Sequence, residues 1–133
     1  RDLAQLAKRV TRNGVTAWDD AGLRRDIGRI CAELDALWAL TKRNISQAQR
    51  TGLVGPGGNV FKLAYAELRT RLGELAMHLL DRASLSIDDI GDLPTHAHVH
   101  GRIHALSLGI AAGTSQVQRN IVAERILGLP KER

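Results

Sequence analysis

A short stretch of small and polar residues near the end of the chain has the composition of an anion site. Gly113-Thr114-Ser115-Gln116 comes just before a run with helical spacing, so these residues would lie at a helix N-terminus. Free backbone N–H groups and the positive end of the helix dipole favour an anion there, by about 0.3–1 kcal/mol at exposed sites. Gly113 would let a ligand approach the backbone closely. The alternative is a capped helix start without a ligand.

Four histidines, His96, His98, His100 and His104, form the densest cluster of titratable side chains. His100 and His104 are four positions apart, so on a helix they would share a face and could hold a metal ion. No cysteine and no close carboxylate joins them, so we expect no metal centre and a solvated loop and helix start. A role in proton transfer stays open, because histidine titrates near neutral pH.

Two other stretches contain residue types that suit phosphate. Arg12, in TRNG at the end of the first apolar stripe, could bind a phosphate through two parallel hydrogen bonds. The alternative for Arg12 is a solvated arginine at a helix end. Residues 55–58, Gly-Pro-Gly-Gly, precede a helix, but no Lys-Ser/Thr pair follows as a P-loop requires, so we interpret them as a loop.

Helices must position these residues, because apolar side chains recur every three or four positions almost throughout the chain. A short stripe from Leu3 to Val10 ends at Asn13-Gly14, which is typical of a helix stop. Longer stripes run over 23–38 and 60–79, and we expect further helices over about 99–111 and 115–126.

Capping residues mark where the longer helices should begin. Asp19 or Asp20 could cap the second helix, and Asn59 could cap the third. Ser115, with Gln118 three residues later, matches a capping box for the last helix. No strand-like alternation of four residues stands out. The sequence therefore predicts an all-α fold, an antiparallel four-helix bundle with the short first helix as an extra, in one domain over 1–133.

Composition narrows the class of protein further. The chain has 133 residues, 44% of them hydrophobic and 25% charged, which suits one globular domain. No stretch approaches the roughly 18 apolar residues of a membrane span, so we expect no membrane partner. The single cysteine excludes an internal disulfide and fits the reducing cytoplasm. The net charge is +5, but the charges alternate in sign and aromatics are only 3%, so we expect no nucleic-acid partner.

The end of the chain resembles the acyl-CoA dehydrogenases, flavoproteins that desaturate acyl-CoA thioesters. The segment AAGTSQVQRNIVAERILGLPKER is similar to the family's usual ending, GTSxxQRNIIAERxLGLP. The loop GPGGNVFKLAYAEL resembles GPxGSxxKL of a bacterial branch. The resemblance implies the C-terminal helical domain, which in whole members follows a helical domain and a β-domain. Since the chain starts at Arg1 within a helical pattern, we expect a C-terminal fragment of a longer flavoprotein.

The resemblance also implies a cofactor and site residues. FAD in this family lies between the β-domain and the bundle, and a neighbouring subunit's bundle also reaches it. Thr114, Ser115 and Gln116 match positions that contact FAD, and Gly113 matches a position beside the acyl-CoA. Arg12 resembles the arginine that reaches FAD across the subunit interface. The implied reaction is α,β-desaturation, for which this fragment alone would be inactive.

Two departures from the family pattern concern the site. Ala112 stands where many members carry the glutamate that removes the α-proton, so we expect no catalytic base in these residues. Other members hold the base on an earlier helix, which would lie before Arg1. At 78–83, HLLDRA replaces the QxxGGxG loop that contacts FAD, and Asp81 would repel a pyrophosphate.

Both departures resemble the bacterial branch that degrades steroid side chains. In that branch two different subunits can form a heterotetramer, and one of them can lack the base or part of the flavin site. Our leading interpretation is therefore the C-terminal domain of an FAD-dependent acyl-CoA dehydrogenase, in a homo-oligomer or a heterotetramer with a related subunit. The alternatives are a non-catalytic partner subunit of the same fold and a ligand-free helical interaction module. The terminal segment argues against the last.

Overall fold

The computed structural model describes residues 2–12, 14–53 and 55–131, and nearly all of its regular structure is helical. Short 3₁₀ turns cover Ala17–Asp19 and Asp81–Leu85. The helices and strands are α1 (Asp2–Arg9), β1 (Thr11–Arg12), β2 (Val15–Thr16), α2 (Ala21–Thr51), α3 (Gly57–Leu80), α4 (Thr95–Leu108) and α5 (Ser115–Arg125).

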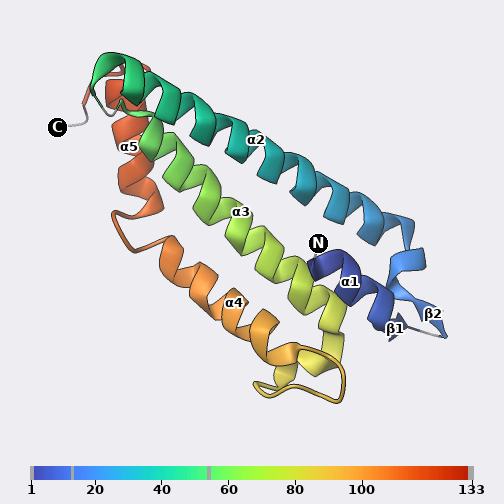
Figure 1. Cartoon of the computed structure of the whole chain (residues 1–133). Helices are drawn as coiled ribbons and strands as arrows, with labels where there is room; N and C mark the ends of the chain where they lie inside the picture. The colour runs from blue at the N-terminus through green and yellow to red at the C-terminus, as the bar shows by residue number, and fades with distance from the viewer. Residues whose placement is uncertain (1, 13, 54, 132–133) are drawn as a thin grey trace.

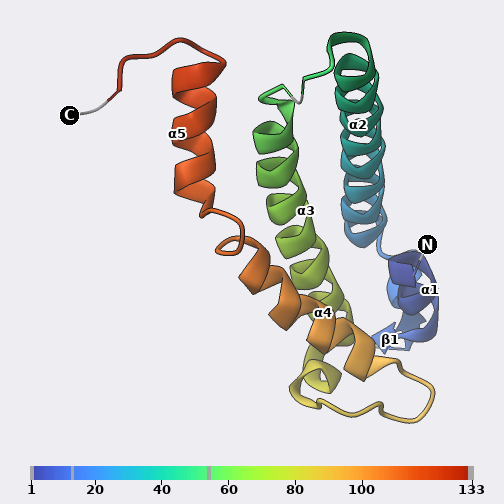
Figure 2. The same ribbon diagram turned by 60° about the vertical axis from the view of Figure 1, so that its left-hand side comes forward.

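Helix α3 lies in the middle of the fold and contacts α2, α4 and α5 (Figure 1). Helix α2 packs along one side of α3, while α4 and α5 follow each other along the other side (Figure 2). All three run antiparallel to α3, and α1 packs near the start of α2 and the end of α3. The predicted all-α, antiparallel fold is confirmed, with four longer helices and the short α1 as an extra. No described helix is long and apolar enough to span a bilayer.

The hydrophobic core joins α1, α2 and α3. Leu6 and Leu79 are almost completely buried, at 1% and 0% exposure. Burying a leucine side chain stabilises the folded state by about 1.5–3 kcal/mol, so these stripes hold the helices together. The other buried core residues of these helices and the turn between them are Leu3, Ala7, Val10, Ala17, Leu23, Ile27, Ile30, Leu37, Leu68, Leu75, Ala76 and Leu80.

Asp20 is the N-cap of α2, as one of the two capping alternatives predicted. Its carboxylate accepts hydrogen bonds from the backbone N–H groups of Gly22 at 2.7 Å and Leu23 at 3.1 Å. The bonds from Leu23 and Gly22 lower the pKa of Asp20 below its usual value. Since the ionised form is favoured in the folded state, this cap stabilises α2 above the ordinary aspartate pKa and is lost as the pH falls through the lowered value.

Three helix boundaries differ from the sequence prediction. Helix α3 begins at Gly57, so Asn59 lies inside its first turn and does not cap it. Pro56, whose ring fixes φ near the helical value, precedes the first residue instead. Helix α4 begins at Thr95, four residues before the predicted start, because the Asp89 side chain accepts from the backbone N–H of His96 at 2.8 Å and satisfies one of the first amides. It ends at Leu108, three residues before the predicted end.

The predicted stop after the first stripe takes the form of a small hairpin. Helix α1 ends at Arg9, and Thr11 and Arg12 pair with Thr16 and Val15 in a two-stranded antiparallel ribbon. Gly14 lies in its turn with a φ of 81°, which glycine adopts without strain. Asn13, the other half of the predicted stop, lies outside the described residues.

Gly73 allows α3 and α4 to approach closely, and we expect Gly73→Ala to lower the free energy of unfolding by about 1–3 kcal/mol. A Cβ at this position would lie 2.8 Å from Cδ and 3.1 Å from Cα of Arg102. The backbone of α4 would have to move away, since it cannot rotate aside as a side chain can. The shift in the urea unfolding midpoint, followed by helical circular dichroism, measures the effect.

Gly28→Ala is the matched control, because no atom of the residues that the structure describes lies within 4 Å of a Cβ at this position in α2. Alanine is a better helix former than glycine by about 0.8–1 kcal/mol, so this variant should be as stable as wild type or more stable. A Gly73→Ala variant that unfolds at the wild-type midpoint would contradict the close approach of α3 and α4.

Candidate functional site

The turn between α4 and α5 contains two consecutive residues in the left-handed region. Ala112 has a φ of 55° and Gly113 a φ of 92°. An L-residue in this region costs about 1–2 kcal/mol, so the surroundings must hold Ala112 there. Such strain persists where neighbouring groups over-determine the backbone, and it is common at ligand sites.

Side chains from two helices hold the carbonyl groups of this turn. Gln118 Nε2, on α5, donates to the carbonyl of Ala112 at 3.1 Å. Lys62 Nζ, on α3, donates to the carbonyl of Gly113. Gln118 is only 5% exposed, and its Nε2 would lie 2.7 Å from any Cβ at position 113. The turn is therefore fixed from two sides, and position 113 requires glycine both for its φ and for space.

Thr114 is the N-cap of α5. Its backbone is extended, with φ −61° and ψ 159°, and its Oγ1 accepts from the N–H of Val117 at 3.3 Å. The predicted capping box of Ser115 and Gln118 is therefore wrong by one position. Ser115 is already helical, and the Gln118 side chain donates to the turn at Ala112 instead of accepting from the Ser115 amide, which donates to the carbonyl of Gly109 at 3.0 Å.

The hydrogen bonds decide which groups at this helix start remain available. The Ser115 amide is already used inside the turn, so only the Ser115 hydroxyl is left for a ligand, and the assignment of Ser115 to FAD stays a prediction. Gln116 is exposed, and its amide lies in the first turn, where no helical carbonyl precedes it. The Thr114 hydroxyl accepts one bond and keeps its proton for another acceptor.

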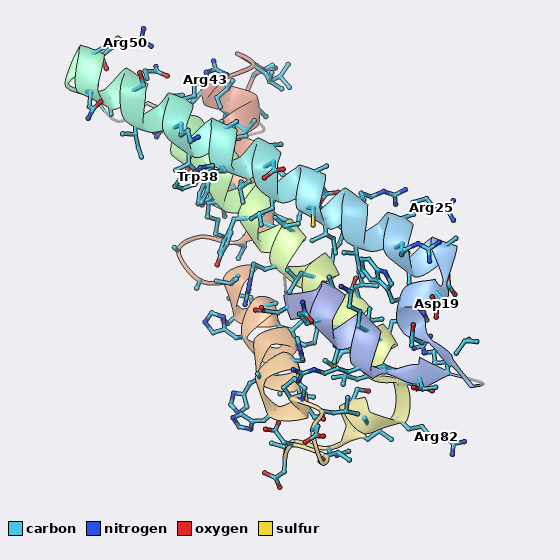
Figure 3. All side chains as sticks on the ribbon, turned by 45° about the vertical axis from the view of Figure 1, so that its right-hand side comes forward. Asp19, Arg25, Trp38, Arg43, Arg50 and Arg82 are labelled. Atoms are coloured by element: carbon cyan, nitrogen blue, oxygen red, sulfur yellow. The ribbon has the colours of Figure 1, made fainter. Side chains whose placement is uncertain are left out.

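Arg12 lies in a second place, an open cavity of about 770 Å³ at the other end of α3. One of its terminal nitrogens donates to the carbonyl of His78 in the last turn of α3, and its Nε is buried without a hydrogen-bond partner among the described residues. Figure 3 shows Arg82 at this end of the fold, beside the hairpin. The lining contains Arg9, Val10, Thr11, Arg12, Leu80, Asp81, Arg82, Ala83, Asp92 and Leu93.

The charges of this cavity offset the expected repulsion by Asp81. Three arginines, Arg9, Arg12 and Arg82, face two aspartates, so the lining has a formal charge of +1. Asp81 has a φ of 51° and a ψ of −123°, a conformation that favours glycine. An anion of moderate charge is thus compatible with the cavity despite Asp81.

The structure does not bring Arg12 together with Thr114, Ser115 and Gln116. Lys62 marks the level of the α4–α5 turn on α3, and His78 marks the level of Arg12. These two positions are sixteen residues apart, or about 24 Å at 1.5 Å per residue. Within one chain, the predicted cofactor residues therefore form two separate places, Arg12 at one and Thr114, Ser115 and Gln116 at the other.

The histidine cluster lies in α4, mostly at its start, and its side chains provide few ligands for a metal ion. The rings of His96 and His100 are 4.6 Å apart between centroids, and His96 Nδ1 lies 3.0 Å from the carbonyl of Ile87. Burial lowers the pKa of His98. No group of three or more metal-ligating residues is found in 2–12, 14–53 and 55–131. The expected absence of a metal centre stays a prediction.

Comparison with protein families gives the match that decides the class of this chain. Residues 1–127 match the model described as acyl-CoA dehydrogenase, C-terminal domain. The chain belongs to this family. The predicted resemblance is thereby confirmed over nearly its full length.

Two curated acyl-CoA dehydrogenases are similar to this domain. The acyl-CoA dehydrogenase IpdE1 of Mycobacterium tuberculosis is 30% identical over 132 residues, which cover 98% of this chain and 31% of that protein. IpdE1 of Mycolicibacterium smegmatis is 32% identical over 134 residues, which cover 98% of this chain and 30% of that protein. The chain thus spans about a third of the length of these acyl-CoA dehydrogenases.

A solved structure confirms the acyl-CoA dehydrogenase fold. A chain in the crystal structure of the ChsE4-ChsE5 complex from Mycobacterium tuberculosis superposes with a TM-score of 0.83. The match covers 99% of this chain and 35% of that chain, at 24% identity. At this identity the similarity shows the fold and no more.

Sequence reasoning missed Lys62 and Gln118 as parts of the candidate site at the α4–α5 turn. Gln118 was assigned to the capping box, and Lys62 was noted only within the loop-and-helix segment GPGGNVFKLAYAEL. The available signal was a lysine inside an apolar run, between Phe61 and Leu63. A charge there needs a partner, but the sequence does not say that the partner is a carbonyl 51 positions away.

Proposed function

We propose that this chain is the C-terminal domain of an FAD-dependent acyl-CoA dehydrogenase that forms the α,β double bond of an acyl-CoA thioester. The observation that supports the proposal is the turn before α5, whose carbonyl groups Lys62 and Gln118 hold in place. The chain that contains this turn belongs to the acyl-CoA dehydrogenase family. We further propose that residues 1–133 are the C-terminal part of a longer cytoplasmic flavoprotein.

The described residues fit a negatively charged or carbonyl-bearing group at the α5 end. The Gln116 amide and the Thr114 hydroxyl donate to it, and Gly113 lies beside the thioester. FAD, when bound, supplies the hydride-accepting chemistry. The chain's own residues bind the ligand and fix its orientation.

Arg12 contacts a different flavin, the one that is bound at the α5 end of a neighbouring subunit. The separation of about 24 Å between the two places supports this division, because one chain then contributes to two flavins. The buried Nε of Arg12, which has no partner in the described part of the chain, is a donor that an anion would satisfy. The surplus of arginines over aspartates in the cavity has the matching charge.

Exposed apolar side chains support an oligomer, either of identical chains or as a heterotetramer with a related subunit. Trp38 is 59% exposed on α2 (Figure 3), and Ile110 after α4 is 71% exposed. Surfaces of this kind are usually covered by a partner. The ChsE4-ChsE5 complex, whose fold this chain shares, combines two named chains. Other exposed members are Leu34, Ile45, Ile103 and Leu106.

A second candidate function, a non-catalytic subunit of a heteromeric acyl-CoA dehydrogenase, is favoured by Ala112. Its methyl group cannot take the α-proton, so this domain supplies no base from that position. The catalytic base is then a glutamate elsewhere in the full-length protein or in its partner. In both candidates the domain provides one wall of the flavin site and part of the assembly.

Flavin binding in the full-length protein tests the proposal, and Gln116→Pro is the sharpest variant. Proline is tolerated in the first turn of a helix, where it removes the backbone N–H of residue 116, and its ring also restricts the helical conformation of Ser115. Losing one hydrogen bond to a charged group should weaken FAD binding about tenfold to a hundredfold. Fluorescence titration of the apoprotein measures the affinity.

Gln116→Ala is the control, since it removes the side chain and keeps the amide. The 133-residue chain alone should bind FAD weakly or not at all, because a few hydrogen bonds are opposed by an association cost of several kcal/mol. Wild-type affinity in Gln116→Pro, or flavin that copurifies with the isolated chain at one equivalent, would contradict the proposed site.

A further inference from the structure

We propose that Lys62 and Gln118 are positioning residues that aim the peptide N–H groups of the α4–α5 turn at the ligand. The proposal rests on the proposed function, because it assigns the ligand to this turn. It concerns two peptide groups, those that join Ala112 to Gly113 and Gly113 to Thr114.

The first step is the geometry of the peptide group. In a planar trans peptide the carbonyl oxygen and the following N–H point in opposite directions. The carbonyl of Ala112 points to Gln118 and that of Gly113 to Lys62, both inside the fold. The N–H groups of Gly113 and Thr114 must then point away from those side chains, and neither has an acceptor within the described chain.

The second step is the backbone conformation. Successive N–H groups around left-handed residues form a concave pair of donors that binds an anion or a carbonyl oxygen. Ala112 and Gly113, with φ values of 55° and 92°, provide that conformation, although it strains Ala112. Without donors for the two carbonyls, the turn would relax and the pair of N–H groups would separate.

The third step concerns the state of the two side chains. The Gln118 side chain is buried, and its Oε1 has no hydrogen-bond partner among the described residues. Stability alone would favour a side chain without this unpaired oxygen. The ammonium of Lys62 donates to the Gly113 carbonyl, on the side of the turn opposite the outward N–H groups, so it holds the peptide group without occupying the place of the ligand. The cost of the unpaired Gln118 oxygen favours a role of this side chain in ligand binding over one in folding.

The experiment compares hydrogen exchange in the full-length apoprotein. The Ser115 amide is the reporter, because its bond to the Gly109 carbonyl closes the turn. Lys62→Met keeps the aliphatic stem and removes the ammonium, and Gln118→Met keeps the volume and removes the amide. Each should speed exchange at Ser115 about tenfold to a hundredfold, and Lys62→Arg, which restores a donor, should recover most of the protection.

Arg119→Met is the matched control. The Arg119 side chain joins α5 to α3 through Glu67 at 2.6 Å, and within the described residues it makes no hydrogen bond to the turn. Exchange at Ser115 should stay within about twofold of wild type, since exposed ion pairs contribute little. FAD and acyl-CoA affinities are then titrated separately in the same variants. Lys62→Met should weaken at least one of them about tenfold, while Arg119→Met leaves both unchanged.

The outcomes separate the two proposals. Unchanged exchange at Ser115 in both Lys62→Met and Gln118→Met overturns the positioning role, whatever the protein binds. Faster exchange with wild-type affinities for both ligands also overturns it, because the turn is then held for folding only. If wild-type protein binds neither FAD nor acyl-CoA, the proposed function fails, while the exchange data still report whether these side chains hold the turn.

Discussion

Under the proposed function, desaturation by the assembled full-length protein is expected to fall about 10²- to 10⁴-fold when one glutamate outside these 133 residues is replaced by glutamine. The α-proton of a thioester is weakly acidic, so the reaction needs a base within about 3 Å of it. Replacing Glu67 or Glu124 of this domain by glutamine should leave the rate within about threefold of wild type, because neither is that base. Steady-state rates with acyl-CoA measure the difference.

The structure gives the reason for both controls. The Glu67 carboxylate is paired with Arg119 at 2.6 Å on the outside of α3 and α5. Glu124 is the tenth residue of α5, about 13–15 Å along the helix from its start. Ala112, which the family resemblance aligns with the usual position of the base, has an exposed methyl group and nothing to titrate.

Ala112→Glu should restore part of the rate, about 10-fold or more, in the variant that lacks the outside glutamate. Alanine already has a Cβ and adopts the left-handed φ of 55° at this position, so glutamate adds no new backbone strain. Two results together would contradict the placing of the catalytic base outside this domain. No glutamate outside the domain would affect the rate, and the wild-type protein would be fully active without a partner subunit.

Leu79→Ala is expected to lower the free energy of unfolding by about 2–5 kcal/mol, the largest stability effect we predict. Leu79 is completely buried, at 0% exposure, where the end of α3 meets the core shared with α1 and α2. Removing its terminal carbons loses their burial and leaves a cavity that the neighbouring side chains fill only in part. Urea unfolding of the full-length protein, followed through the helical signal, measures the change.

Leu85→Ala is the matched control for this variant. Leu85 lies six positions later in the 3₁₀ turn, and it is 87% exposed. Truncation there should change stability by less than about 0.5 kcal/mol. An equal loss in both variants would show that Leu85 is covered in the assembled protein, and a loss below about 1 kcal/mol for Leu79→Ala would contradict its place in the core.

Much of the fold was predictable because each helix that buries one face shows apolar residues at a regular spacing in its own sequence. The three- and four-residue spacing in the chain identified every long helix, and Asp20 was among the residues named as the cap of α2. The helix boundaries that were predicted wrongly depend on side chains that the apolar spacing does not reveal. The start of α4 depends on the Asp89 side chain, and the start of α5 depends on which of two hydroxyl residues, Thr114 or Ser115, keeps an extended backbone.

The sequence by itself determined the family, the all-α class and the absence of an ionisable group at Ala112, because these depend on residue types and their spacing. Only the tertiary structure decided that Lys62 reaches the carbonyl of Gly113 and that Arg12 lies at the far end of α3 from Thr114. Spacing along a helix specifies which face a residue occupies. It does not specify which distant backbone group that face will meet, since this depends on how the connecting turns direct the helices.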